Sequence, residues 1–91
     1  MKNFFTDYRG VTLTFGDMEE KADGMEFVDV LLERVSDKKV FDFIVTQIPG
    51  FKVYDSRGFS DDEIKQWIEY TMRNSVIIWE VAKEKRAEKL A

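Results

Sequence analysis

The tetrapeptide Ser60-Asp61-Asp62-Glu63 is the strongest local signal in the chain, because it has the form of a helix capping box. The Ser60 hydroxyl can accept a hydrogen bond from the Glu63 amide, and the Glu63 carboxylate can reach back to the Ser60 amide. The three acids also oppose the positive end of a helix. The sequence therefore predicts a helix from Asp61 to about Lys89, which takes the last third of a chain of 91 residues.

The predicted helix has one buried face, because its apolar and small residues recur three and four positions apart. The members of this stripe are Ile64, Trp67, Ile68, Thr71, Ser75, Ile78, Trp79 and Ala82. Cations are concentrated between Lys83 and Lys89, where the negative end of a helix favours them. A helix of this length spans roughly 40 Å, so we expect its last turns to project from the domain into solvent or toward another chain.

Three segments before the helix have the composition of β-strands, since they are rich in β-branched and aromatic residues. The first, Val11–Phe15, alternates strictly. The second, Glu26–Arg34, could also form a short helix, but its valines favour a strand. The third, Val40–Gln47, ends before Pro49 and forms a hairpin with the second across the polar turn 36–39. The predicted inner face consists of Val11, Leu13, Phe15, Val28, Val30, Leu32, Phe41, Phe43 and Val45.

Two registers of this hairpin keep the predicted faces. One register pairs Val35 with Val40 and sets Glu33 directly opposite Asp42, a pair of like charges. The other pairs Arg34 with Lys39 and sets two cations against each other. Each register carries one unfavourable pair of like charges, so the sequence leaves both open.

The remaining segments complete the predicted fold. Residues 16–24 are bounded by glycines and rich in acids, which indicates a long exposed connection. Phe51–Tyr54 is a candidate for a short fourth strand, followed by a turn at 55–58. Together the elements predict an α+β fold, an antiparallel three- or four-stranded meander sheet with one long C-terminal helix packed on one face. No repeat or linker divides the chain, so we expect residues 1–91 to form a single domain.

The residue types that are absent exclude several classes of enzyme. The chain has no cysteine and no histidine, which excludes thiolate nucleophiles, Ser-His-Asp triads, Cys/His zinc sites and haem histidines. Candidate acid/base groups are Asp29, Glu33 and Asp42 on the outer sheet face, or Tyr54 with Arg57. Nothing in their spacing distinguishes them from ordinary surface residues. We therefore expect no catalytic activity and no cofactor.

An acidic loop is the one candidate for a metal site. Asp17, Glu19, Glu20 and Asp23 offer carboxylate oxygens, but the alternating ligands, central glycine and terminal glutamate of a calcium loop are missing. The sequence favours a solvated loop over a metal site at this position.

The charge and the hydropathy of the chain bear on its surroundings. The net charge is −4, so the overall field repels nucleic-acid backbones and anionic lipids. No apolar run has the length of a signal peptide or of a membrane span. We expect a cytoplasmic protein that does not bind membranes. Binding to nucleic acid is the less favoured alternative.

Apolar residues outside the predicted core are the most informative feature for function. On the helix, Tyr70, Ile77 and Val81 lie roughly 100° or more from the centre of the buried stripe. On the outer sheet face, Phe27, Leu31 and Ile44 are predicted, with Val40 and Ile48. The candidate interface residues are Phe27, Leu31, Ile44, Tyr70, Ile77 and Val81. The other interpretation is that residues 1–8, 16–24 and 51–59 fold over these faces.

The functional hypothesis from the sequence is a small non-catalytic protein–protein interaction module. We expect it to be homodimeric or bound to another small protein, because identical apolar patches meet most simply across a twofold axis. The alternative is a nucleic-acid-associated regulator, or an inhibitor of a DNA-binding protein.

The C-terminal part of the chain also resembles a known kind of protein. Ser56-Arg57-Gly58-Phe59-Ser60, followed by a helix with Asn74, Trp79 and Glu80, resembles the closing segment of a family of small bacterial proteins of unknown function. The resemblance spans about a third of the chain and implies strands first, a helix last and a partner protein. The strand region of that family carries histidines, which this chain lacks, so the resemblance implies no site residues.

Overall fold

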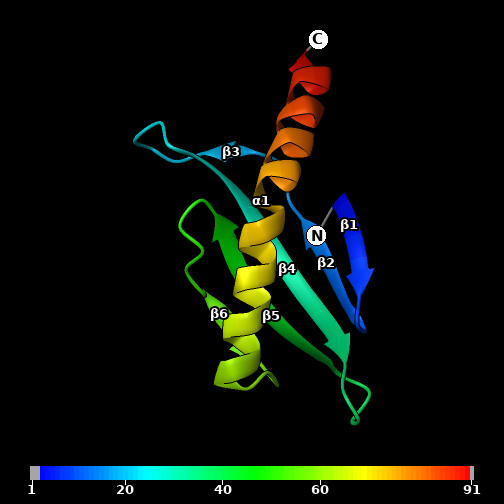
Figure 1. Cartoon of the computed structure of the whole chain (residues 1–91). Helices are drawn as coiled ribbons and strands as arrows, with labels where there is room; N and C mark the ends of the chain where they lie inside the picture. The colour runs from blue at the N-terminus through cyan, green and yellow to red at the C-terminus, as the bar shows by residue number, and fades with distance from the viewer. Residues whose placement is uncertain (1–2, 91) are drawn as a thin grey trace.

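The structure, a computed structural model, describes residues 3–90 and consists of one sheet and one helix (Figure 1). The sheet is antiparallel in the order β1-β2-β4-β5-β6, and β3 pairs with the beginning of β4. The helix α1 crosses one face of this sheet, and its C-terminal turns extend past the strands (Figure 1). The elements are β1 (Asn3–Tyr8), β2 (Val11–Phe15), β3 (Glu19–Glu20), β4 (Glu26–Val35), β5 (Phe41–Ile48), β6 (Asp55–Arg57) and α1 (Asp61–Leu90). The predicted α+β class is confirmed, with more strands than the three or four expected.

The edge of the sheet is a tight hairpin of β1 and β2. Tyr8 pairs with Val11, so only Arg9 and Gly10 form the turn. Their φ angles of 50° and 78° are both left-handed, as in the type I′ turn whose twist matches that of the flanking strands. β1 is a strand that the sequence patterns did not identify.

The segment 16–24 is more structured than the predicted exposed connection. β3 lies inside it and pairs with Glu26 and Phe27 of β4. Met18 is 7% exposed and belongs to the core. The predicted exposure holds for residues 19–24. It fails at Met18, an apolar side chain close behind β2 that anchors this segment to the molecule.

The β4–β5 hairpin adopts neither of the two predicted registers. Val35 pairs with Phe41 and Arg34 with Asp42. A loop of three residues, 37–39, closes the hairpin, and its last residue, Lys39, has a left-handed φ of 58°. The change of register inverts β5, because successive side chains of a strand point to opposite faces.

The inverted strand corrects the predicted core. Ile44 and Ile48 point toward α1 together with Thr46, and all three are buried. Phe41, Phe43 and Val45, which were predicted inside, lie on the other face. The predictions for β2 and β4 are confirmed. The buried hydrophobic residues are Val11, Leu13, Phe15, Met18, Val28, Val30, Leu32, Ile44, Ile48, Phe59, Ile78 and Ala82.

The connection from β5 to α1 also differs from the prediction. Phe51–Tyr54 is not a strand, and the predicted turn at 55–58 contains β6, which pairs with residues 43–45 of β5. Gly50 and Phe51 both have left-handed φ angles, which are incompatible with an extended strand at that point. The Thr46 hydroxyl donates a hydrogen bond of 2.8 Å to the carbonyl of Lys52 and holds this loop against the sheet.

The helix begins as the capping box predicted. The Ser60 amide donates to Glu63 Oε1 at 2.9 Å, and the Glu63 amide donates to Ser60 Oγ at 3.2 Å. None of the eight residues of the predicted stripe is exposed, and Thr71, Ile78 and Ala82 are fully buried. In the last turns most side chains are exposed, while Arg86 forms an ion pair with Glu26.

An arginine on β4 joins the hairpin to the start of the helix. Arg34 Nε donates to Asp42 Oδ2 at 3.1 Å, Nη1 donates to Glu63 Oε2 at 2.7 Å, and Nη2 donates to the carbonyl of Gly58 at 2.9 Å. Its guanidinium lies 4.0 Å from the centre of the Phe59 ring. The hydrogen bond from Arg34, and next the one from the Ser60 amide, lower the pKa of the Glu63 carboxyl to about 2.

Candidate functional site

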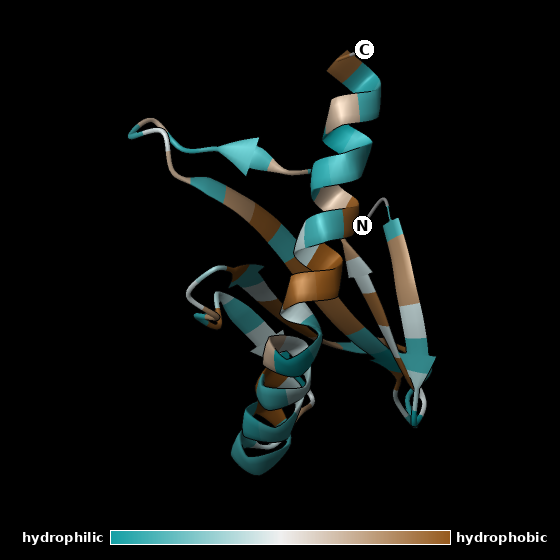
Figure 2. Ribbon diagram, turned by 45° about the horizontal axis from the view of Figure 1, so that its top comes forward, coloured by the Kyte–Doolittle hydropathy of each residue, from teal (hydrophilic) through white to brown (hydrophobic). Residues whose placement is uncertain are grey.

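The face of the sheet that points away from α1, called the outer face below, carries the candidate site. No helix or strand among residues 3–90 covers it, since the one helix lies on the opposite side (Figure 1). Strand alternation places every second side chain of β4 and β5 on it. Figure 2 shows hydrophobic bands along β4 separated by hydrophilic ones. The apolar residues of the outer face are Phe4, Phe27, Leu31, Val35, Phe41, Phe43 and Val45.

Much of this apolar surface is accessible. Phe4, Val35 and Phe41 are 64%, 67% and 53% exposed. Phe27, Leu31, Phe43 and Val45 are half-buried by their neighbours within the sheet alone. An apolar surface spread over three strands is larger than the scattered apolar residues that any surface carries, so it is typical of a contact surface.

Charges of opposite sign stand on either side of Phe43 in one row of the sheet. Glu33 pairs with Phe43, and Phe43 pairs with Arg57. The Arg57 guanidinium lies 5.3 Å from the centre of the Phe43 ring, and Nη2 donates to the carbonyl of Phe41 at 2.6 Å. The half-buried Glu33 carboxylate makes no hydrogen bond or ion pair with any residue between 3 and 90. The row therefore holds an anion that lacks a cation and a cation exposed beside it.

Three polar side chains of the outer face, those of Asp29, Gln47 and Tyr54, are linked in series by hydrogen bonds. Gln47 Nε2 donates to Asp29 Oδ1 at 2.8 Å, and the Tyr54 hydroxyl donates to Gln47 Oε1 at 2.9 Å. Asp42, expected on the outer face, points instead toward the helix side and pairs with Arg34. The candidate acid/base groups are thus dispersed over two faces of the sheet, and no two of their carboxylates share a site.

The predicted interface residue Ile44 does not lie on the outer face. It is 0% exposed and packs in the core, as does Ile48 at 5% exposed. Both placements were wrong because the register of β5 differs by an odd number of residues from the predicted ones. Phe41, Phe43 and Val45 take their place. Phe27 and Leu31 lie on the outer face as predicted.

The three predicted interface residues on the helix are dispersed. Tyr70 and Val81 are half-buried against the edge of the core. Ile77 is 56% exposed. Sequence analysis missed two further exposed apolar residues of α1, Met72 and Val76, which are 47% and 72% exposed. Figure 2 shows a hydrophobic band in the middle of α1.

The acidic residues of the segment 16–24 do not gather around one point. Among residues 3–90, no group of three or more carboxylates is close enough to share a metal ion. Glu19 and Glu20 lie in β3 and are exposed, and Asp17 forms an ion pair with Lys89 at 2.5 Å.

Comparison with known proteins identifies no relative. No family model, no curated protein and no solved structure matches the chain. The architecture implied by the resemblance of the C-terminal segment is present, strands first and a helix last, but no family is shown. Within residues 3–90, α1 is too polar to be a membrane span.

Proposed function

We propose that the chain is a non-catalytic interaction module that forms a homodimer by packing its outer face on the outer face of a second copy. The observation that supports this proposal is the uncovered apolar sheet, whose free side carries seven apolar residues across β1, β4 and β5. Two sheets stack at about 10 Å when their side chains interdigitate. A second copy supplies the missing layer of such a sandwich.

The charges of the Glu33–Phe43–Arg57 row fit a second copy of the same chain. A twofold axis that runs along β5 exchanges the two sides of this strand. It therefore places Arg57 of each copy opposite Glu33 of the other, while Phe43 meets Phe43. The anion that lacks a cation within one copy would obtain one from its partner.

The size of the outer face is compatible with a dimer. With the twofold axis along β5, only β4, β5 and β6 of the two copies overlap. At about 4.8 Å between strands and about 3.3 Å per residue, their 10, 8 and 3 residues present at most roughly 330 Å² in projection. Stable complexes bury about 800 Å² of accessible surface on each partner, and the accessible surface of a face with side chains exceeds its projection. An overlap of this extent lies at the low end of protein interfaces and fits a weak dimer.

The experiment is sedimentation of the purified chain over a range of concentrations. We expect a dimer of twice 10.7 kDa for the wild type. Phe43→Glu places a charge at the centre of the proposed interface and should give a monomer. Ile77→Glu places the same charge at an exposed helical position and should leave the dimer intact. A monomeric wild type would contradict the proposal, and a dimer lost only in Ile77→Glu would move the interface to the helix.

A charge exchange tests the twofold arrangement itself. Glu33→Arg and Arg57→Glu should each weaken the dimer, because each brings like charges together across the axis. The double variant restores the attraction and should recover most of the lost affinity. Failure of the double variant to recover would exclude this pairing even if the protein is dimeric.

The nucleic-acid alternative has less support than the homodimer. Phe41, Phe43 and Arg57 could stack bases, but Asp29, Glu33 and Asp55 share the same face. Salt-sensitive retention of the wild type on immobilised DNA would favour this alternative. The cytoplasmic location and the bacterial source remain predictions from the sequence.

A further inference from the structure

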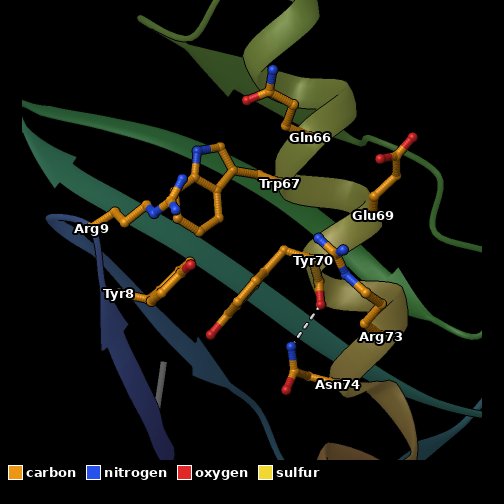
Figure 3. Close-up of a pocket in the computed structure, with 8 residues that line it drawn as sticks. All are labelled: Tyr8, Arg9, Gln66, Trp67, Glu69, Tyr70, Arg73 and Asn74. Atoms are coloured by element: carbon orange, nitrogen blue, oxygen red, sulfur yellow. Dashed lines mark hydrogen bonds between the residues drawn. The ribbon is translucent and has the colours of Figure 1, made fainter.

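A hollow lined by aromatic and charged side chains lies on the helix side of the sheet, where β1 meets α1 (Figure 3). It has a volume of about 580 Å³. Pockets for small molecules range from about 300 to 1,000 Å³, so this hollow has the appropriate size. Its lining residues are Tyr8, Arg9, Gln66, Trp67, Glu69, Tyr70, Arg73 and Asn74.

Three aromatic rings form the wall of this hollow. Tyr8 and Tyr70 are stacked, with ring centres 5.0 Å apart and planes 6° from parallel. Trp67 meets both edge-on, at 6.2 Å from Tyr8 and 5.3 Å from Tyr70. The rings stay accessible, since Tyr8 is 41% exposed and the other two are half-buried. Such a wall offers both ring faces and ring edges to a further aromatic group.

The two cations of the hollow come from different elements. Arg9 lies on the β1–β2 turn and Arg73 on α1, with the rings between them (Figure 3). The Arg9 guanidinium is 5.2 Å from the centre of the Tyr8 ring. Neither arginine side chain forms an ion pair or a hydrogen bond within residues 3–90. Their guanidinium groups are therefore available to an anion.

The local charge is opposite in sign to that of the whole chain. Arg9 and Arg73 against Glu69 give the hollow a net charge of +1, whereas the whole chain carries −4. The Asn74 side-chain amide donates to the carbonyl of Tyr70 at 2.8 Å, which leaves its oxygen as an acceptor. Charge and shape together select a flat ring that carries a negative group.

We propose that this hollow, called the aromatic pocket below, binds a small molecule made of a planar aromatic ring and a carboxylate or phosphate group. The ring packs against Tyr8, Trp67 and Tyr70, and the anion is held by Arg9 or Arg73. This site lies on the side of the sheet opposite the proposed dimer face, so the two proposals can fail separately.

The test follows the indole N–H signal of Trp67 in the ¹⁵N-labelled full chain. Trp79 does not line the pocket and supplies a second indole signal as an internal reference, with Trp79→Phe assigning the two. The probes are 4-hydroxyphenylacetate, tyramine and 4-methylphenol, which share one ring and differ in charge. We expect saturable shifts of Trp67 with 4-hydroxyphenylacetate, at a Kd of about 1 mM or lower, and binding of tyramine at least about tenfold weaker.

Variants at the rim separate recognition of an anion from mere packing of a ring. Arg73→Gln and Arg9→Asn should each weaken the binding of 4-hydroxyphenylacetate by about tenfold. Lys83→Gln removes the same charge at an exposed helical position and should leave this binding unchanged. Glu69→Gln should strengthen the binding of 4-hydroxyphenylacetate, because it removes a carboxylate that repels the anion. Tyramine binding as tightly as 4-hydroxyphenylacetate, or no saturable shift with any probe, would overturn the proposal.

A further arm distinguishes the two sources of the anion. Adenosine monophosphate carries its negative charge on a phosphate and its ring on a nucleoside. Tighter binding of adenosine monophosphate than of 4-hydroxyphenylacetate would assign the pocket to nucleotides, and the reverse order would assign it to aromatic carboxylates. Failure of adenosine monophosphate together with 4-hydroxyphenylacetate counts against the pocket as a whole.

Discussion

Arg34 and Asp42 face each other across the β4–β5 hairpin, with Nε of the arginine 3.1 Å from Oδ2 of the aspartate. Asp42 is only 13% exposed in its side chain, so the pair lies at the rim of the core and not in open solvent. The same guanidinium binds Glu63 at the first turn of α1. This one cation thus fixes both the register of the hairpin and the position of the helix start.

Replacement of Arg34 by methionine should destabilise the fold. It leaves the carboxylates of Asp42 and Glu63 without their cation and removes a hydrogen bond to the Gly58 carbonyl. We expect a loss of about 1 to 3 kcal/mol in the free energy of unfolding, below the range for fully buried pairs because Arg34 is partly exposed. Urea denaturation measures it. Arg73→Met, which breaks no ion pair, is the control and should change stability by about 0.5 kcal/mol or less.

The stability of the protein should fall in acid through Glu63. Its pKa is about 2 in the folded state against an ordinary value of 4.5. A lowered folded pKa means that the stabilisation is complete above the unfolded pKa and is lost as the pH falls from 4.5 toward about 2. Urea denaturation at pH 7, pH 4 and pH 2 should show a steeper loss in the wild type than in Glu63→Gln. Parallel curves for the two proteins would contradict this.

Gly58 should tolerate alanine worse than Gly24 does. Both have left-handed φ angles, 83° and 85°. A Cβ atom on Gly58 would lie 1.9 Å from Asp42 Oδ1, while one on Gly24 would have nothing within 4 Å. Gly24→Ala should therefore cost about 1 to 2 kcal/mol from backbone strain alone. Gly58→Ala should cost about 1 to 3 kcal/mol more, because the carboxylate that binds Arg34 must move. Equal losses in thermal or urea denaturation would show that no such displacement occurs.

Two neighbouring residues of β5 test the observed register. Ile44 is 0% exposed beneath α1, whereas Val45 lies half-buried on the outer face. Ile44→Ala should lower the free energy of unfolding by about 2 to 5 kcal/mol, and Val45→Ala by about 1 kcal/mol in the monomer. Measurements at a concentration below dimerisation separate core packing from assembly. The reverse order would favour the registers predicted from the sequence.

The β1–β2 turn should gain stability from Arg9→Asn. Arg9 has a φ of 50°, and asparagine occupies this region at lower cost than arginine. Asn-Gly is also the preferred pair of a type I′ turn. We expect a gain of about 0.5 kcal/mol in thermal or urea denaturation. Arg9→Lys, which retains the charge but not the turn preference, should leave the stability near that of the wild type.

The elements with a single strong period could be predicted from the sequence. Val11–Phe15 and the helix that begins at Asp61 are confirmed at their starts, because strict alternation and a capping box each permit one interpretation. The sequence could not decide whether residues 1–8 form a strand, because polar and apolar residues are mixed in β1 without a clear period. β3 was missed because its two residues are too short to show any period. The prediction of segment 16–24 could not account for Met18, whose burial depends on core residues far away in the sequence.

The register of β5 could not be predicted because both of its faces are apolar. Phe41, Phe43 and Val45 are together larger and more hydrophobic than Ile44, Thr46 and Ile48, so pattern alone selects the former as the core. Asp42 lies on the same face of β5 as Ile44, Thr46 and Ile48, and a carboxylate on that face argues against its burial. Arg34 removes that objection, since it compensates the carboxylate at the rim of the core. Opposite charges on the two strands were the signal that could have indicated the observed pairing.

The aromatic pocket escaped sequence analysis for a related reason. Tyr8 and Arg9 come from the first hairpin, while Trp67, Tyr70 and Arg73 come from the helix. No spacing within either segment indicates that the two will meet. Tyr70 was identified only as an apolar residue outside the buried stripe, and the structure places it against Tyr8.

Because the helix covers only one face of the sheet, the side chains of β4 form two groups, one packed in the core and one on the outer face. Val28, Val30 and Leu32 hold the molecule together, whereas Phe27, Leu31 and Glu33 could be exchanged while the backbone stays as it is. Substitutions in the second group can therefore redirect which molecules this protein recognises without endangering its ability to fold.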